Sequence, residues 1–371
     1  MKKILVTGAK GFVGKNLCLS LKNSEKYEVM EYDVDTEESL LEEFIMQADF
    51  LVHLAGVNRP KEDKEFETGN HGFTSQIIDM LEKRDKRTSI IFSSSIHAEK
   101  DNPYGTSKRN AEQVIFDYGR RNNAEVFVYR LPNLFGKCCR PNYNSVIATF
   151  CHNIARDLPI TVNDPNYVMN VAYIDDVVDE FINAIEGRAN IKEDGFCYVP
   201  ITYTRALGEI AILIQSFKES RKNLLVPNMD DELCKKLYST YLSYLKEDDF
   251  SYPLKMNVDH RGAFTEFLKT HERGQVSVNV SKPGIVKGNH WHHTKNEKFL
   301  VVSGEAVIRF RKIGEKDIIE VRVSDKELRV VDIPPGYTHS IENVGQTDLV
   351  TIMWANECFD PERPDTYYEE V

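Results

Sequence analysis

The sequence contains no run of about 18 consecutive apolar residues, the shortest stretch that usually forms a membrane-spanning helix. Its first residues, Met1, Lys2 and Lys3, lead directly into a strand-like segment without the apolar region of a cleavable secretion signal. Positive charge is also scarce, because 47 Lys and Arg residues stand against 58 Asp and Glu residues, a formal net charge of −11. This balance argues against a general attraction to nucleic acid or to an anionic membrane surface. We therefore expect a cytoplasmic protein. Any anionic ligand must be bound by hydrogen-bond donors and positive charges gathered at its own site.

Cysteine pairs with Cys-x-x-Cys spacing are absent as well. The seven cysteines are odd in number and scattered, as expected of reduced thiols that mostly pack in the interior. They are Cys18, Cys138, Cys139, Cys151, Cys197, Cys234 and Cys358.

The length of 371 residues exceeds what one hydrophobic core usually supports, so we expect two domains. Hydrophobic residues at 41% and charged residues at 28% are typical of a globular chain. The segment 244–253 is polar, acidic and ends in proline, and we place the passage between the domains there. The predicted domains cover 1–245 and 246–371.

The first domain opens with the pattern of a dinucleotide-binding fold. An apolar strand over 3–6 leads into a turn with Gly8, Gly11 and Gly14, which opens a helix through Leu21. Such glycines let the backbone approach a pyrophosphate, which then lies against the positive end of the helix. A tight strand-to-helix connection without a ligand is the alternative. Expected cofactor contacts are Gly8, Lys10, Gly11, Phe12, Val13 and Gly14.

Two further strands of this domain point to a nicotinamide cofactor. The strand over 28–32 ends at Asp33, whose carboxylate can accept hydrogen bonds from an adenosine ribose and repels a 2′-phosphate. Locally, this favours NAD over NADP. The strand within 48–56 ends in small residues, and we expect Leu54 and Ala55 to lie against the cofactor. Together the strands predict a Rossmann-type, doubly wound parallel sheet.

Tyr104 and Lys108 lie four residues apart at the start of a helix and therefore share a helix face. The Lys108 ammonium can lower the pKa of the phenol from about 10 towards neutrality. A tyrosine of this kind can protonate a carbonyl oxygen as hydride reaches the carbon. The strand over 89–95 ends in Ser94 and Ser95, and either hydroxyl could hold the same oxygen. A surface Tyr and Lys pair is common, but its place after these elements favours catalysis.

Over roughly residues 1–240 these elements resemble the extended short-chain dehydrogenase/reductase (SDR) family. The resemblance implies that Tyr104 and Lys108 are catalytic and contact the cofactor. It also implies a catalytic serine, for which we prefer Ser95 over Ser94.

The same resemblance implies a nucleotide-sugar substrate. Asn70 is expected to complete the site, and Arg130 and Asn133 are candidates for sugar or phosphate contacts. A structural role in the loop is the alternative for the last two residues. Helical patterns within 140–227 fit a smaller substrate-binding lobe.

The second domain carries metal-binding residue types at strand spacing. His290 and His292 share one face of a strand, because alternate side chains point to the same side, and Glu297 can join them from the next strand. After a turn over 334–337, His339 supplies a third imidazole. Three imidazoles and a carboxylate suit Zn²⁺, although the set does not exclude manganese, iron or nickel. Ordinary strand histidines are the alternative.

The spacings within 284–304 and 334–343 resemble the two consensus motifs of the cupin superfamily. The resemblance implies an all-β jelly roll. One departure is Leu328, where the second motif begins with glycine, and it puts a turn in doubt rather than the metal.

Residues 257–266 resemble the opening of the deoxysugar 3,5-epimerases of the cupin class. The resemblance implies that Arg261 and Glu266 line a sugar-nucleotide site, with a surface salt bridge as the alternative. It also makes His290 the proton-abstracting base, but a metal-bound imidazole cannot easily act as a base. If His290 binds metal, the base comes from elsewhere. Candidates by proximity alone are Lys298, Lys295, His293 and Tyr337.

The whole chain resembles a family of bifunctional enzymes of capsular polysaccharide synthesis. The resemblance implies C3 epimerisation of a UDP-linked 4-keto-6-deoxy-N-acetylhexosamine in a zinc cupin. It further implies NADPH-dependent C4 reduction to UDP-N-acetyl-6-deoxy-L-talosamine, towards UDP-N-acetyl-L-fucosamine, and a homodimer. The order follows from chemistry, because the C4 ketone acidifies the C3 hydrogen and reduction removes that acidity.

The cofactor is a point of conflict, since Asp33 favours NAD(H) whereas the family uses NADPH. Lys10 can supply positive charge near a 2′-phosphate, and we choose NADP(H). Two other classes of function stay open. One is a reductase whose cupin serves as a dimerisation module with a structural metal. The other is a non-catalytic nucleotide sensor, against which the complete Ser, Tyr and Lys set argues.

Overall fold

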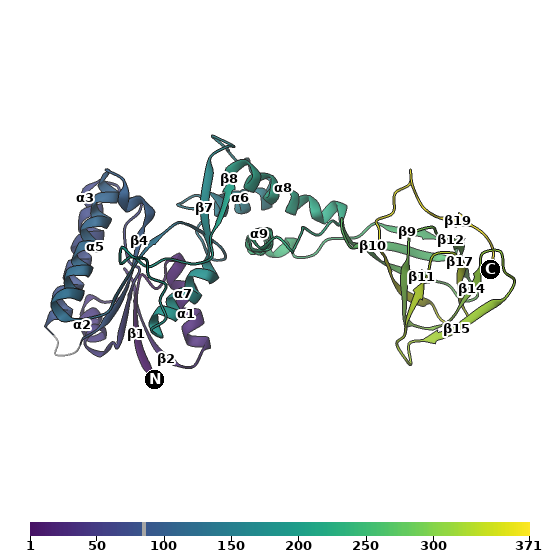
Figure 1. Ribbon diagram of the computed structural model, residues 1–371, viewed down its shortest axis with the longest axis horizontal. Helices are drawn as coiled ribbons and strands as arrows, with labels where there is room; N and C mark the ends of the chain where they lie inside the picture. The colour runs from purple at the N-terminus through teal and green to yellow at the C-terminus, as the bar shows by residue number, and fades with distance from the viewer. Residues whose placement is uncertain (84–86) are drawn as a thin grey trace. The chain divides into compact units, whose positions relative to one another are not determined.

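Figure 1 shows the computed structural model, which describes residues 1–83 and 87–371. The chain divides into two units. The first consists of residues 1–214 and 236–245, and the second of residues 215–235 and 246–371. The predicted fold class is confirmed, since the first unit contains a parallel sheet with helices and the second contains antiparallel sheets. Among the described residues, no helix has both the length and the apolar character to span a membrane.

A five-stranded parallel sheet in the order β2-β1-β3-β4-β5 forms the centre of the first unit. The strand order reverses between β1 and β3, and open parallel sheets bind ligands at the carboxyl ends next to such a reversal. The strands are β1 (Lys2–Thr7), β2 (Tyr27–Tyr32), β3 (Phe50–His53), β4 (Ser89–Ser95) and β5 (Val126–Leu131).

Helices cover both faces of this sheet because its strands are apolar on both sides. Ile4 and Val6 pack towards α1 (Phe12–Asn23) and α7 (Ile174–Ile185). Leu5 points the other way, into a core formed with α2 (Glu38–Gln47), α4 (Phe73–Glu82) and α5 (Pro103–Asn122). In Figure 1, α1 and α7 lie on one side of the strands, and α2 and α5 lie on the other.

Smaller elements complete the first unit, and two of the helices, α8 and α9, lie partly in each unit. A short sheet has the order β6-β7-β8. The chain passes between the two units within α8 and α9, and again after residue 245. The remaining elements are α3 (Lys64–Phe66), a π-helical turn (Glu67–Gly72), 3₁₀ turns (Ile96–Glu99, Glu247–Asp249), β6 (Asn133–Phe135), α6 (Val146–Ala155), β7 (Val168–Tyr173), β8 (Tyr203–Ala206), α8 (Leu207–Asn223) and α9 (Glu232–Leu242).

Two antiparallel sheets form the β-rich part of the second unit, with the orders β16-β13-β18-β11-β10-β9 and β15-β14-β17-β12-β19. Phe299 and Val301 from the first sheet pack with Ile308, Phe310 and Ile341 from the second, so the core lies between the sheets. The strands are β9 (Met256–Asp259), β10 (Gly262–Thr270), β11 (Gly274–Ser281), β12 (Val286–Trp291), β13 (Glu297–Ser303), β14 (Glu305–Lys312), β15 (Ile318–Ser324), β16 (Val330–Ile333), β17 (Tyr337–Asn343), β18 (Leu349–Ala355) and β19 (Tyr367–Tyr368).

The departure from the cupin pattern at Leu328 lies in the exposed connection between β15 and β16. Leu328 is not among the residues with positive φ, so its backbone has no need for glycine here. The turn closes without disturbing the strands on either side.

Candidate active sites

A cleft with a volume of about 1750 Å³ lies at the carboxyl ends of the strands in the first unit. The loops after β1, β3 and β4 and the segment around β6 form its walls. It brings together most of the residues expected from the sequence. Those that line it are Gly8, Lys10, Gly11, Phe12, Val13, Gly14, Asp33, Leu54, Ala55, Asn70, Ser94, Ser95, Tyr104, Lys108 and Asn133.

The glycine turn is set by close backbone contacts. Gly8 has a φ of +70°, and a Cβ atom there would lie 2.8 Å from the backbone nitrogen of Ala55. A Cβ atom on Gly14 would lie 2.2 Å from the carbonyl oxygen of Gly8. Both positions therefore require glycine for the fold itself. Gly11 precedes α1 without a side-chain cap, which leaves backbone amide groups of the first turn for an anionic ligand.

The Asp33 carboxylate is already engaged in the turn that it borders. It accepts the backbone N–H groups of Lys10 (2.7 Å) and Val34 (2.8 Å). The ammonium of Lys10 pairs with Asp35, whose hydrogen bond raises the pKa of Lys10 above its usual value. The edge of the cleft therefore combines two carboxylates and one ammonium group.

The two candidate serines occupy different environments. Ser94 is buried, and its hydroxyl donates to the carboxylate of Glu112 on α5. The Ser95 hydroxyl accepts the backbone N–H of His97 at 3.1 Å and opposes the rise in the pKa of Tyr104 that burial causes, which places it near the phenol. This geometry supports Ser95 as the hydroxyl that acts together with Tyr104.

Contrary to the prediction from the sequence, the pKa of Tyr104 is not lowered towards neutrality. Burial raises this pKa, and the nearby Ser95 hydroxyl opposes that rise only in part. The Lys108 ammonium instead donates to the carbonyl oxygen of Ser93 at 2.7 Å and lies 4.6 Å from the ring centroid of Phe92. Burial lowers the pKa of Lys108 to about 8. Sharing a helix face therefore brought the two residues close without fixing the direction of the ammonium.

Asn70 is buried in the π-helical turn and holds two loops together. Its Oδ1 accepts the backbone N–H of Val57 at 2.8 Å. Its Nδ2 donates to the Val57 carbonyl oxygen (3.1 Å) and to the Ser107 hydroxyl (3.0 Å). These bonds use both donors of the amide, which supports a positioning role next to Tyr104.

Arg130 does not line the cleft. Its Nε and Nη2 atoms donate to the two carboxylate oxygens of Glu112 at 3.0 Å and 2.7 Å, and Nη1 lies 3.2 Å from Glu99. The guanidinium also lies over the ring of Phe196. The structure thus favours the structural role that was left open for Arg130. Asn133 lines the cleft, and its Nδ2 donates weakly to Asn170 at 3.4 Å.

Two arginines that no sequence motif marked also line the cleft. The guanidinium carbons of Arg59 and Arg140 lie 5.5 Å and 5.1 Å from the ring centroid of Tyr143. Nε of Arg59 donates to Asn144 Oδ1 at 3.0 Å. Within residues 1–83 and 87–371, neither guanidinium forms an ion pair. The available signal was their position in loops at the carboxyl edge of the sheet.

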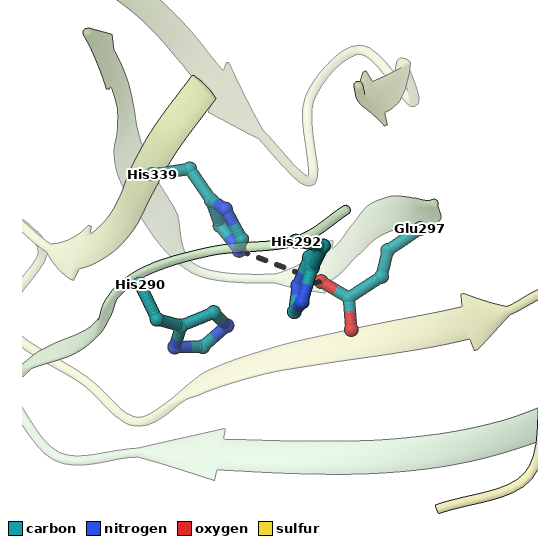
Figure 2. A group of neighbouring side chains, drawn as sticks. All are labelled: His290, His292, Glu297 and His339. Atoms are coloured by element: carbon teal, nitrogen blue, oxygen red, sulfur yellow. Dashed lines mark ion pairs between the residues drawn. The ribbon is translucent and has the colours of Figure 1, made fainter. Parts of the chain in front are cut away.

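The four predicted metal ligands meet in the second unit (Figure 2). His290 lies one residue before the end of β12, opposite His339 of β17 and next to a register shift after Gly288. His292 follows β12, and Glu297 begins β13 in the other sheet. One ligand atom from each of the four residues lies within 4.8 Å of the others. Oε2 of Glu297 is 3.6 Å from Nε2 of His292 and 3.4 Å from Nε2 of His339.

Several of these atoms are buried without a hydrogen-bond partner. They are Nε2 of His292, Oε2 of Glu297 and both ring nitrogens of His339. Buried polar atoms are nearly always satisfied, and leaving one unsatisfied costs about 1–3 kcal/mol. A divalent cation would satisfy the group, and three imidazoles with a carboxylate are ligands that Zn²⁺ accepts. The residues present therefore fit a metal ion.

The protonation states of the cluster also suit a cation. Burial lowers the pKa of His290 to about 4, with contributions from His339 and His292. Burial by itself would raise the pKa of Glu297, but its contacts with His292 and His339 outweigh this and hold that pKa well below its usual range. Metal ligation needs neutral imidazole and ionised carboxylate. His290 and Glu297 are in these forms near neutral pH.

Arg261 and Glu266, expected at a sugar-nucleotide site, are engaged in local ion pairs. Nε and Nη2 of Arg261 lie 3.0 Å and 2.7 Å from the Asp259 carboxylate at the exposed β9–β10 turn. Glu266 lies 2.9 Å from Nζ of Lys269. These contacts support the surface salt bridge that was the alternative reading.

The candidates for the epimerase base each have another partner. Lys298 pairs with Asp332 on the exposed side of β13, and His293 packs against Trp291. Lys295 is buried, and its ammonium donates to backbone and side-chain oxygens of a distant segment. Tyr337 packs against the core between the sheets. Proximity in the sequence therefore does not single out one of them.

The fold and the two sites define a two-part class of protein, an SDR-type domain joined to a cupin-type domain with a candidate metal site. Residues 4–196 match the NAD dependent epimerase/dehydratase family, and residues 257–367 match the polysaccharide biosynthesis C-terminal domain. The chain belongs to the NAD dependent epimerase/dehydratase family, whose members use a nicotinamide cofactor.

Two relatives match the chain over nearly its whole length, and a third matches a shorter part. The chain is 56% identical to the capsular polysaccharide assembling protein CapF from Staphylococcus aureus, with a TM-score of 0.94 and coverage of 99% of this chain and 100% of that one. It is 44% identical to the UDP-2-acetamido-2,6-beta-L-arabino-hexul-4-ose reductase of Pseudomonas aeruginosa, over 98% of both chains. The spore coat polysaccharide biosynthesis protein SpsL of Bacillus subtilis is 27% identical over 124 residues, 30% of this chain and 81% of its own. The resemblance to enzymes of capsular polysaccharide synthesis is confirmed.

Proposed function

We propose that the protein is a bifunctional nucleotide-sugar enzyme of capsular polysaccharide synthesis. Its second unit inverts C3 of a UDP-linked 4-keto-6-deoxy-N-acetylhexosamine, and its first unit then reduces the C4 ketone with NADPH. The product is UDP-N-acetyl-6-deoxy-L-talosamine, towards UDP-N-acetyl-L-fucosamine. The name of the Pseudomonas relative supports the reduction, since it describes a reductase of a 2-acetamido-2,6-dideoxy sugar with a ketone at C4.

One observation carries the reductase half: Ser95, Tyr104 and Lys108 line the same cleft as the glycine turn. The substrate ketone oxygen lies between the two hydroxyl groups, and Tyr104 gives its proton to that oxygen. A bound nicotinamide supplies the hydride. Lys108, held by the Ser93 carbonyl, provides the nearby positive charge that favours the phenolate left on Tyr104.

The unpaired arginines of the cleft support an anionic substrate. In a chain with a net charge of −11, Arg59 and Arg140 line the cleft without acidic partners among the described residues. Guanidinium groups bind phosphate oxygens through paired N–H donors. We assign them to the diphosphate of the nucleotide sugar.

The metal cluster supports the epimerase half. A divalent cation in this site would supply Lewis-acid chemistry beside the C4 ketone. His290, His292, Glu297 and His339 would hold it, so His290 is a ligand and the base is a different residue. The burial of the ligand atoms keeps water from weakening these contacts.

The choice of NADPH rests on the family resemblance and on Lys10 at the edge of the cleft. Its ammonium lies beside Asp35, and a 2′-phosphate would compete with that carboxylate for it. Rates with NADPH and NADH at equal concentration test this choice, and a faster rate with NADH would reverse it. On the same resemblance we propose a cytoplasmic homodimer.

The proposal is tested by proton NMR of the 4-keto sugar nucleotide in deuterated water, without a nicotinamide cofactor and with or without a metal chelator. We expect deuterium at C3, and we expect chelation to abolish the exchange. Exchange that survives metal removal would contradict metal-dependent epimerisation. No exchange with metal-loaded protein would reduce the function to that of a C4 ketone reductase with a structural cupin.

A further inference from the structure

Residues 364–371 contact the end of β12, the strand that carries His290. Within this segment, β19 pairs in antiparallel fashion with His290 and Trp291 at the end of β12. The ring of Tyr367 stacks on Trp291, with centroids 4.7 Å apart. The backbone N–H of Glu369 donates to the carbonyl oxygen of Asn289 at 3.0 Å. The segment is therefore anchored beside the first histidine of the cluster.

Asp365 of this segment fixes the loop between two metal ligands. Its carboxylate accepts three successive backbone N–H groups, from His293 (2.9 Å), Thr294 (2.9 Å) and Lys295 (2.8 Å). Successive amides that converge on one anion form a stable concave site. These three residues lie in the loop that leads from His292 to Glu297, so the carboxylate holds the connection between ligands from two different sheets.

Asp365 also orients one ligand directly. Its carbonyl oxygen lies 2.6 Å from Nδ1 of His292. Because a carbonyl can only accept, Nδ1 carries the hydrogen and Nε2 is left with a lone pair, on the side that faces Glu297. Asp365 has a φ of +37°, a conformation that aspartate tolerates better than most residues. One residue therefore contacts the loop with its side chain and the imidazole with its backbone.

The two residues that flank Asp365 accept hydrogen bonds from Lys295 of the loop. Nζ of Lys295 donates to the carbonyl oxygen of Pro364 (2.7 Å) and to Oγ1 of Thr366 (2.9 Å). Lys295 is 7% exposed, so its ammonium is removed from water and depends on these acceptors. The loop and the 364–371 segment thus hold each other through contacts in both directions.

We propose that Asp365 is a positioning residue of the metal centre. It holds His292 and the 293–295 loop so that His292 and Glu297 can bind the same cation. This inference deepens the proposed function and depends on its metal site. Partners that orient a metal-bound histidine raise metal affinity by limiting the motion of the ligand. Without the carboxylate, the loop must be ordered each time a cation binds, and part of the affinity is lost.

The test compares Asp365→Asn with the unchanged protein, as full chains stripped of metal. The amide places N–H donors against backbone N–H donors, while the backbone carbonyl that orients His292 remains. Competition with a chromophoric chelator measures Zn²⁺ affinity, and we expect a loss of about 10–100-fold. Asp360→Asn is the matched control, because Asp360 is exposed in the same region and, among the described residues, its carboxylate accepts only the N–H of Glu362 (2.9 Å). It should bind Zn²⁺ as tightly as the unchanged protein.

Thermal unfolding gives a second readout that does not depend on activity. The rise in Tm on adding Zn²⁺ should be smaller in Asp365→Asn than in Asp360→Asn, because a ligand stabilises the folded state according to its affinity. Zn²⁺ affinity of Asp365→Asn within about twofold of the unchanged protein would overturn the inference. If the unchanged protein fails to bind Zn²⁺ or a similar cation, the proposed metal site itself is wrong. Should Asp365→Asn not fold, Asp365→Glu, which keeps the charge but displaces it, is judged by the same criteria.

Discussion

The two candidate sites differ in how far the protein satisfies its own polar groups. In the cleft of the first unit, Asn70, Ser94 and Lys108 each have hydrogen-bond partners within the protein. In the second unit, His339 and Glu297 present buried atoms that lack such partners. In the first site, these polar groups are satisfied and held in place by the protein itself, without a ligand. The second becomes complete only with a cation, so metal should matter for its stability as well as its chemistry.

This contrast predicts that the two chemical steps can be removed separately. Tyr104→Phe deletes the proton donor of the cleft and leaves its hydrogen-bonded surroundings largely unchanged. We expect NADPH oxidation with the 4-keto sugar nucleotide to fall by about 10²–10⁴-fold, the usual contribution of a positioned acid. Deuterium exchange at C3 should continue at the unchanged rate. Loss of both reactions in a folded protein would mean that the sites do not act independently.

Glu297→Ala is the reverse experiment, and its effect should extend to stability. It removes one of four ligands, so C3 exchange should stop and Zn²⁺ affinity should fall by more than the roughly 10–100-fold typical of residues that only support a ligand. Reduction of an already epimerised substrate should persist. Glu305→Ala is the control, since Glu305 is exposed and pairs only with Lys326 among the ion pairs of the described residues. A Glu297→Ala protein that still exchanged C3 would place the epimerase chemistry elsewhere.

The sequence predicted most of what depends on local spacing. Gly8 and Gly14 are required by backbone contacts between adjacent elements, and these contacts recur wherever a strand turns into a helix in this way. His290 and His292 share a strand face by the two-residue repeat of a strand. The ligands therefore came together as expected, because their positions follow from periodicity within short segments.

Orientation across distant segments could not be predicted in the same way. Arginine is a residue type that often binds phosphate, but the guanidinium of Arg130 forms an ion pair with Glu112 on a neighbouring helix. Lys108 donates to β4, because the Ser93 carbonyl lies within reach. Asp365 lies 73 residues from His292, so no local pattern links them. In each case the partner comes from another element, and only the packing of those elements selects it.

Arg140→Ala tests the part of the cleft that no sequence motif marked. A charge-assisted contact contributes about 1.5–3 kcal/mol, and 1.4 kcal/mol corresponds to tenfold in affinity. We expect KM for the nucleotide sugar to rise by about tenfold or more, with little change in kcat. Arg188→Ala, which removes an arginine paired with Glu186 outside the cleft, should leave KM unchanged. An unchanged KM in Arg140→Ala would remove this residue from the substrate site.

The smallest expected effect is a shift in the pH dependence of reduction. Glu112 lies one helical turn after Lys108, and its charge raises the pKa of Lys108 against the larger lowering effect of burial. Lys108 must be charged to favour the phenolate on Tyr104, so reduction should decline as the pH rises through a pKa of about 8. Neighbouring His53 is buried and its pKa is lowered to about 3, so it adds no charge near neutral pH.

In Glu112→Gln the negative charge is lost, the pKa of Lys108 falls further, and the alkaline limb of the kcat/KM profile should move to lower pH. Glu99→Gln is the control, since Glu99 is exposed and contacts only the outer nitrogen of Arg130 among the ion pairs of the described chain. Thermal unfolding of both variants separates this effect from destabilisation by the broken Arg130 pair. If the alkaline limb stayed in place in folded Glu112→Gln, Lys108 would not be the group that limits reduction at high pH. The first site would then depend on its hydrogen bonds more than on its charges.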